Sequence, residues 1–188
     1  MLRAALPVRR AAFRQLLSGQ AVSIDDIAAA AGLAVESTRQ AAHDVASVGM
    51  AELDDGTVVG MDGLTTRTSL HGITLAGVKL WTWCAYDIVG IAAALGTDAE
   101  GTTQCGACGR RLEVQVRAGE PEKSTVVGWL PGEACSNVLA EFCPSALFFC
   151  SMEHLEIWLW TSDEGGGEAL DLSALAERGR EEWRQLVS

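Results

Sequence analysis

One segment constrains the fold more than any other. Residues 80–96 read LWTWCAYDIVGIAAALG, an apolar run interrupted by a single aspartate. A run that is apolar all round is typical of a buried helix, so we expect a helix from about Leu80 to Gly96. In such a helix Cys84 and Asp87 are three residues apart and share one face. A buried carboxylate costs several kcal/mol unless it is paired or protonated, so Asp87 must have a specific role there.

Composition limits the classes of partner. The chain has 188 residues, 48% of them hydrophobic, which is enough for a buried core, and its formal net charge is -11. This charge repels phosphate backbones and anionic lipid surfaces, so we expect neither nucleic-acid nor membrane binding. A membrane-spanning helix needs about 20 apolar residues, and no apolar run approaches this length. No secretory signal pattern is recognisable. We therefore expect a cytoplasmic protein whose six cysteines stay reduced.

The N-terminal sequence predicts a winged helix-turn-helix. Ser23 followed by Asp26 is a helix-capping pattern, and Gly32 separates two helical patterns. The expected elements are a helix over 7–18, a helix ending at Ala31, a helix over 35–48 and two short strands around 54–56.

DNA binding is not favoured for this part, although the element order is common among DNA-binding proteins. The second helix carries one arginine, Arg39, against two acids, Glu36 and Asp44. Contacts to bases and phosphates require a cationic face. We therefore expect the winged-helix-like part to be a structural or lid-forming unit.

The rest of the chain mixes strand and helix patterns, so the predicted fold class is α+β. We divide the chain into a winged-helix-like part, residues 1–64, and a second domain, residues 65–188. The expected elements are short strands within 65–80, strands over 111–117, 124–130 and 146–151, a turn at 131–132, helical segments over 137–141 and 154–160, a loop over 163–168 and a final amphipathic helix over 172–187.

A second segment with chemical potential is EFCPSALFFCS, residues 141–151. Cys143 precedes Pro144, which biases it away from helical geometry, so a bend there is expected to present the thiol to a pocket. Phe148 and Phe149 are expected to pack beneath it. Taken alone, each segment also fits a plain core, with Cys84 as a small hydrophobe and Asp87 as a cap for a loop.

Together the two segments resemble the organomercurial lyase, or alkylmercury lyase, family. The resemblance lies in WCAYD at residues 83–87, Cys105 about twenty residues later, FC at 142–143, FF at 148–149 and Trp158, and it extends over about residues 20–165. It implies a winged-helix-like N-terminal part ahead of a catalytic domain, residues 65–188, that has a mixed sheet with helices.

The resemblance implies that Cys84, Asp87 and Cys143 are the two catalytic cysteines and the catalytic aspartate of a lyase. Such an enzyme cleaves carbon–mercury bonds by protonolysis to a hydrocarbon and Hg(II), without an organic cofactor. Soft thiolates select soft metals, and a desolvated carboxyl can hold the proton that the departing carbon needs. The same three residues would hold the Hg(II) product, which a small thiol or a dithiol protein would accept. Which thiol reacts first is left open.

Aromatic residues close to these motifs suit an alkyl or aryl group. We expect the pocket to be lined by Trp81, Trp83, Phe148 and Phe149, although the same residues also fit an ordinary core.

The motif QCGACG suggests a separate metal site. Cys105 and Cys108 form a C-x-x-C-G turn of the zinc-knuckle type, which would need Cys135 and one further ligand to close a zinc site. A redox role, or delivery of Hg(II), is also open for this pair. Cys150 is expected in the core, and His154 is expected to be an ordinary polar residue.

Two other functions remain open. One is a soft-metal-binding (Hg, Cu or Zn) or regulatory protein on the same fold without turnover. The other is a lyase-like enzyme that acts on a non-mercurial substrate. Asp87 favours an enzyme, because metal binding needs only thiols whereas bond cleavage needs a proton donor.

Overall fold

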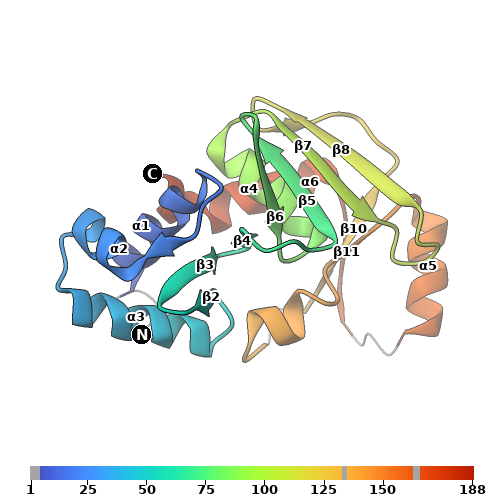
Figure 1. Cartoon of the computed structure of the whole chain (residues 1–188). Helices are drawn as coiled ribbons and strands as arrows, with labels where there is room; N and C mark the ends of the chain where they lie inside the picture. Colours follow the sequence, from blue (N-terminus) through green and yellow to red (C-terminus); the bar gives the residue numbers. More distant parts are fainter. Residues whose placement is uncertain (1–4, 133–134, 163–165) are drawn as a thin grey trace.

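The computed structural model describes residues 5–132, 135–162 and 166–188, and it combines helices with two sheets (Figure 1). The predicted α+β class is confirmed. The helices are α1 (Leu6–Leu16), α2 (Ile24–Ala31), α3 (Val35–Ser47), α4 (Ala85–Leu95), the π-helix η1 (Val138–Phe142), α5 (Met152–Thr161), α6 (Leu172–Glu182) and α7 (Arg184–Val187). None of these helices is long and apolar enough to cross a bilayer.

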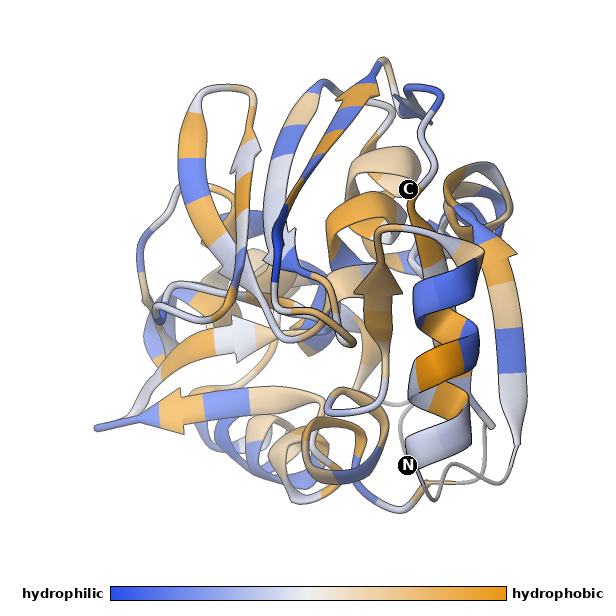
Figure 2. Ribbon diagram, turned by 90° about the vertical axis from the view of Figure 1, so that its right-hand side faces the viewer, coloured by the Kyte–Doolittle hydropathy of each residue, from blue (hydrophilic) through white to orange (hydrophobic). Residues whose placement is uncertain are grey.

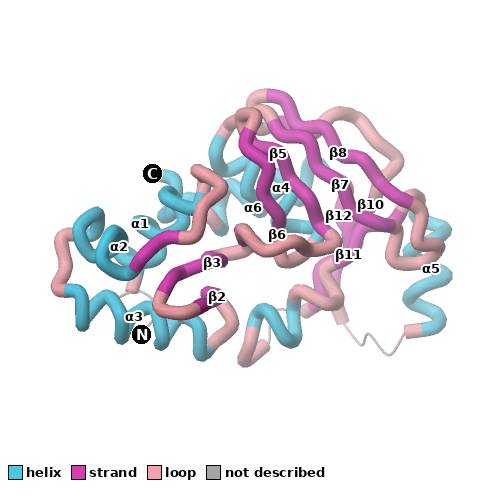
Figure 3. Tube along the Cα trace, viewed as in Figure 1, coloured by secondary structure: helices cyan, strands magenta, loops and turns pink. Residues whose placement is uncertain are grey.

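All strand pairs within the two sheets are antiparallel. The large sheet has the order β1-β3-β4-β6-β5-β7-β8-β9, with β2 paired to β3, and the small sheet has the order β11-β10-β12 (Figure 3). The strands are β1 (Val22–Ser23), β2 (Ala51–Asp54), β3 (Thr57–Met61), β4 (Leu64–Thr65), β5 (His71–Leu75), β6 (Val78–Thr82), β7 (Ala99–Gln104), β8 (Arg111–Arg117), β9 (Glu120–Pro121), β10 (Val127–Pro131), β11 (Leu147–Phe149) and β12 (Gly167–Asp171).

The N-terminal part has the predicted winged helix-turn-helix elements, α1 to α3 followed by the β2–β3 hairpin. The Ser23 Oγ accepts a hydrogen bond of 3.1 Å from the Asp26 N–H, which confirms the predicted cap of α2. Gly32 ends α2 with φ +67°, in the left-handed region that favours glycine. Both local signals therefore have the physical effect expected from the sequence.

The large sheet continues from the N-terminal part into the rest of the chain. Strand β4 pairs with β3 on one side and with β6 on the other, so ladder hydrogen bonds run across residue 64. The division of the chain at residue 64 stays a prediction.

Helix α4 packs against the large sheet, behind its strands in the view of Figure 1, and α6 packs against α4. They approach closely at two glycines, because a Cβ atom on Gly179 would lie only 2.2 Å from the Gly90 Cα. Hydrophobic and hydrophilic residues alternate along the strands of the sheet (Figure 2), and α4 is buried along almost its whole length. Burial on all sides explains why the α4 sequence is apolar all round.

Several expected boundaries need correction. The helix predicted from Leu80 begins only at Ala85, because residues 80–82 belong to β6 and pair with β5, while Thr82 and Trp81 also pair with β4. Strand pairing with distant residues overrides the apolar run, which by itself does not distinguish a strand from a helix.

Smaller differences between the predicted and the observed elements concern β10, β7, β12 and the loop before β12. The predicted strand over 124–130 is β10, which extends through Pro131 into the expected turn. Strands β7 and β12 were not predicted, because their sequences AEGTTQ and GEALD carry few β-branched or aromatic residues. Of the loop expected over 163–168, residues 163–165 lie outside the described residues, and residues 167 and 168 belong to β12.

Candidate active site

Cys84 and Asp87 lie at the start of α4, not in its interior. Cys84 is the N-cap residue with extended backbone (φ -140°, ψ 173°), and Asp87 occupies the third helical position. The Cys84 N–H donates a hydrogen bond of 2.9 Å to the Asp87 Oδ2, and the Cys84 side chain faces the Asp87 backbone N–H. This reciprocal arrangement is a capping box that fixes the thiol and the carboxyl side by side.

Cys143 directly follows the π-helix η1 and has helical backbone angles (φ -58°, ψ -37°). The expectation that Pro144 would bias Cys143 away from helical geometry was wrong. The Cys143 N–H bonds to the Val138 carbonyl at 2.9 Å, and the Ala146 N–H bonds back to the Cys143 carbonyl at 3.3 Å. These bonds outweigh the local preference of a residue before proline.

The structure brings the three predicted residues together. The two Sγ atoms and a carboxylate oxygen of Asp87 all lie within 4.8 Å of one another. Their residues are almost inaccessible, at 0% for Cys84, 5% for Asp87 and 6% for Cys143. A hydrogen bond of 3.3 Å from the Ala85 N–H to the Ala146 carbonyl joins the start of α4 to the segment after Cys143.

Burial shifts the protonation of Cys84 and Asp87. Burial raises the pKa of Asp87 from its ordinary value of 3.8 to about 7, although the Cys84 N–H bond opposes the shift. Burial also raises the pKa of the Cys84 thiol, and the contact with Cys143 and the Asp87 charge raise it further. Near neutral pH the Cys84 thiol therefore keeps its proton and the Asp87 carboxyl can hold one, close to a position where a soft metal would bind.

Gly63 shapes the floor beneath Asp87. It has φ +92°, and a Cβ atom there would lie 2.8 Å from the Asp87 Cγ. Its carbonyl accepts a hydrogen bond of 2.9 Å from the Trp83 N–H. Only glycine combines this backbone conformation with such close approach to the carboxyl.

A cavity of about 490 Å³ opens onto Asp87 and Cys143. Its apolar wall includes Met50, Trp83, Tyr86, Val138, Phe142, Trp183 and Leu186. The expected aromatic lining is correct only for Trp83. Trp81 lies beneath the Lys79 ammonium, which is 5.5 Å from its ring centroid, and Phe148 and Phe149 are core residues. Trp81 lies within β6, whereas Trp83 follows the last residue of that strand and directly precedes the N-cap of α4, so the two side chains belong to different local structures.

Polar side chains hold the cavity wall together. Arg9 of α1 donates to Asp62 at 3.0 Å, and both residues line the cavity. The Tyr86 hydroxyl donates to the Glu182 carboxylate at 2.9 Å, and the Trp183 ring N–H donates to the Asp62 carbonyl at 2.7 Å. The winged-helix-like part and the C-terminal helices therefore both form the pocket around the trio.

A second cluster lies outside this cavity. It consists of Cys105, Cys108, Cys150 and His154, whose Sγ and ring nitrogen atoms lie within 4.8 Å of one another. The predicted set of Cys105, Cys108 and Cys135 was wrong in its third member, because Cys135 lines the cavity instead.

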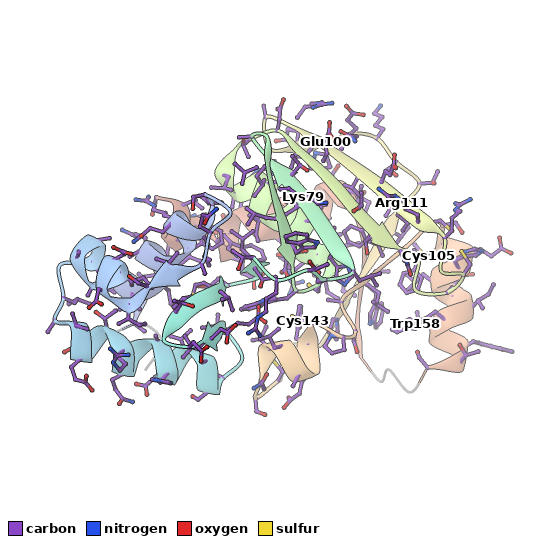
Figure 4. All side chains as sticks on the ribbon, in the orientation of Figure 1. Lys79, Glu100, Cys105, Arg111, Cys143 and Trp158 are labelled. Atoms are coloured by element: carbon purple, nitrogen blue, oxygen red, sulfur yellow. The ribbon has the colours of Figure 1, made fainter. Side chains whose placement is uncertain are left out.

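Sequence reasoning missed Cys150 and His154 as members of this cluster. Their four-residue spacing could have indicated them, because Cys150 precedes the N-cap Ser151 of α5 and His154 lies in the first turn of that helix. Figure 4 labels Cys105 at the end of β7, near α5, and Cys143 on the separate segment after η1.

Comparison with known proteins gives a consistent result. Residues 64–183 match the family model of alkylmercury lyase, and residues 5–62 match that of the helix-turn-helix domain of alkylmercury lyase. An alkylmercury lyase of Bacillus cereus is 31% identical over 179 residues, which cover 91% of this chain and 78% of that protein. An alkylmercury lyase of Staphylococcus epidermidis is 32% identical over 155 residues, covering 80% of this chain and 70% of that protein.

The fold comparison extends over almost the whole chain. The crystal structure of the mercury-bound form of MerB2 superposes with a TM-score of 0.89 at 25% identity, covering 98% of this chain and 91% of that one. The sequence resemblance, the element order and the family models agree. The chain belongs to the alkylmercury lyase family.

Proposed function

We propose that this protein is an organomercurial lyase that cleaves carbon–mercury bonds by protonolysis, with Cys84, Cys143 and Asp87 as its catalytic residues. One observation carries the proposal. Two buried thiols and a carboxyl with a pKa of about 7 converge within 4.8 Å in a chain of the alkylmercury lyase family. Thiols supply the soft ligands that mercury prefers, and the carboxyl supplies a proton donor.

The first half of the reaction loads the substrate. One thiol bonds to the mercury of R–Hg–X, where X is a small thiolate, and X leaves as the protonated thiol. The proton that X gains comes from the enzyme thiol through Asp87, whose pKa of about 7 allows it both to accept and to donate near neutral pH.

The second half breaks the carbon–mercury bond. The other thiol gives its proton to Asp87 and becomes the second sulfur ligand of mercury. Asp87 then transfers that proton to the carbon, so that R–H leaves and Hg(II) remains on the two thiolates. Two thiol protons are consumed in all, one by X and one by R, and no external oxidant or reductant is required.

The surroundings support the same reaction. The apolar wall formed by Trp83, Phe142 and Trp183 suits an alkyl or aryl group and keeps water from the carboxyl. A small thiol or a dithiol protein would remove the Hg(II) product, and a reducing cytoplasm would keep the thiols active. Arg9 and Met50 give the winged-helix-like part a place in the wall of the pocket.

The test is to measure the hydrocarbon product. Reduced protein is incubated with a phenylmercury salt and excess small thiol, and benzene is quantified by gas chromatography. Benzene should form catalytically with the wild type and with the matched surface variant Asp25→Asn, because Asp25 is exposed on α2. It should fall to background in Cys84→Ser and Cys143→Ser and fall strongly in Asp87→Asn.

The competing function, soft-metal binding without turnover, makes the opposite prediction. Tight mercury binding with the phenyl group still attached would identify a binding protein. Absence of both binding and cleavage would indicate a non-mercurial substrate.

A further inference from the structure

Four metal-ligand side chains meet at a corner that the proposed reaction does not use. Cys105 follows β7, Cys108 lies in the turn before β8, Cys150 follows β11, and His154 is in the first turn of α5. None of the four lines the cavity around Asp87. Three thiol sulfurs and one imidazole nitrogen form a donor set that is characteristic of structural zinc sites.

The distances suit a tetrahedral ion. With Zn–S bonds of about 2.3 Å and a Zn–N bond of about 2.0 Å, two sulfurs are roughly 3.8 Å apart and sulfur and nitrogen roughly 3.5 Å apart. The Cys150 Sγ is 3.7 Å from the Cys105 Sγ and 3.9 Å from the Cys108 Sγ, and the Cys105 Sγ is 3.5 Å from the His154 Nδ1. The Cys150–His154 contact, 2.9 Å, is a hydrogen bond that a central ion would lengthen and replace.

The backbone holds the first two ligands in a knuckle. The Gly109 N–H bonds to the Cys105 carbonyl at 2.9 Å, and the Cys105 N–H bonds to the Arg110 carbonyl at 2.9 Å. Gly109 has φ +69°, which the tight turn after Cys108 requires. The Gly106 N–H bonds to the Phe148 carbonyl at 2.9 Å, so this turn is already fixed against β11, the strand that precedes Cys150.

The geometry argues against two simpler explanations. The thiols are not disulfide-bonded, because the sulfur separations of 3.7 and 3.9 Å far exceed a bond of about 2.05 Å. They are not simply core hydrophobes either, because Cys108 is exposed and the His154 ring nitrogen turns toward two of the sulfurs.

We propose that Cys105, Cys108, Cys150 and His154 bind one structural zinc ion that fastens the β7–β8 turn to the corner between β11 and α5. Four protein ligands leave no open position, so the ion has no catalytic role. Because β11 begins four residues after Cys143, the zinc also fixes the strand that follows this catalytic thiol.

The experiment counts zinc in the reduced full-length protein. After purification, dialysis against a weak chelator and elemental analysis, the wild type should retain one zinc per chain. The double variant Cys84→Ser/Cys143→Ser should retain it too, since it removes both thiols of the other cluster. Cys108→Ser and His154→Ala should each weaken zinc binding by more than about 100-fold. Loss of a residue that only hydrogen-bonds to a zinc ligand costs less than this.

Two further samples keep the test decisive if a variant folds poorly. His154→Cys should restore zinc binding through a set of four thiolates, and Cys135→Ser should retain zinc although it also removes one thiol. Replacing zinc by Co(II) in the wild type should give the intense visible absorption of a tetrahedral thiolate site.

Four outcomes would overturn the proposal. Zinc could be lost from Cys84→Ser/Cys143→Ser, or it could be retained in Cys108→Ser. The cobalt protein could show an octahedral spectrum, or the wild type could bind Hg(II) but no zinc at these residues. Zinc content is independent of benzene release, so failure here and failure of the lyase proposal are distinguishable.

Discussion

The two cysteine clusters of this protein differ in their side chains and in their access to the cavity. The trio at the start of α4 combines two thiols with the carboxyl of Asp87, whereas the corner near α5 combines three thiols with the imidazole of His154. Asp87 and Cys143 of the trio line a cavity of about 490 Å³, and no residue of the corner cluster lines it. Both clusters offer soft ligands, but only the trio has space for a substrate and a buried acid.

In the two proposals made above, the same side chain serves two purposes. Two thiol donors and a carboxyl that supplies a proton leave room for a metal–carbon bond and a means to break it. Four donors around one point close the coordination sphere and leave only a structural use. The accompanying group and the cavity, not the cysteines themselves, decide the chemistry.

The largest effect should come from removing a sulfur of the trio. Cys143→Ser replaces a soft ligand by a hard hydroxyl, so benzene release from phenylmercury should fall to the uncatalysed level. Stopped assays analysed by gas chromatography measure it. Activity that persists in this variant but disappears in Cys108→Ser would reverse the roles of the two clusters.

Removing the acid should have the next largest effect. Asp87→Asn keeps an oxygen acceptor for the Cys84 N–H but cannot deliver a proton, so the first turnover should slow by about 10²- to 10⁴-fold. Mercury binding, measured by competition with a small dithiol, should change by less than about tenfold. An unchanged first turnover would remove Asp87 from the mechanism.

The same variant should stabilise the fold at alkaline pH. The folded-state pKa of Asp87 is raised from 3.8 to about 7, so between these values the folded protein holds a proton that the unfolded chain has lost. Stability therefore falls as pH rises through this window, by up to about 4 kcal/mol. Asp87→Asn should raise the free energy of unfolding at pH 8 and have little effect at pH 4.

Chemical denaturation of Asp87→Asn and Asp25→Asn at both pH values measures this difference. Equal behaviour of the two variants at pH 8 would mean that the Asp87 carboxyl is not destabilised by burial.

The smallest effect concerns the cavity wall. Phe142→Ala should lower kcat/KM for phenylmercury by about 10-fold, because it removes apolar contacts with the organic group. The effect on methylmercury should be smaller, since a methyl group has less surface to contact. Equal losses for both substrates would indicate that Phe142 supports the position of Cys143 instead of contacting substrate.

Local signals in the sequence predicted much of the fold. The Ser23–Asp26 cap, the glycine after α2 and the alternation in β8 depend on residues close in the chain, and each appears as expected. The start of α4 could not be predicted in this way. Residues 80–82 pair with β5, and Trp81 and Thr82 also pair with β4, so only the assembled sheet makes them strand.

The two clusters also show that residues close in the chain are easier to group from the sequence than residues far apart. Cys84 and Asp87 are close in sequence, and the family resemblance added Cys143 across more than fifty residues. The corner cluster joins two local pairs, Cys105 with Cys108 and Cys150 with His154, and the hydrogen bond from Gly106 to Phe148 links the segments that carry them. No spacing rule relates those pairs, so Cys135 was chosen in place of Cys150.

The most direct test of the account is a single turnover in D2O. Zinc-loaded protein receives one equivalent of phenylmercury without added thiol, and benzene, bound mercury and bound zinc are counted together. We predict one singly deuterated benzene per chain, with mercury retained on the protein and zinc undisturbed. Mercury bound with its phenyl group intact, or benzene released with an equal loss of zinc, would contradict the assignment of cleavage to the trio.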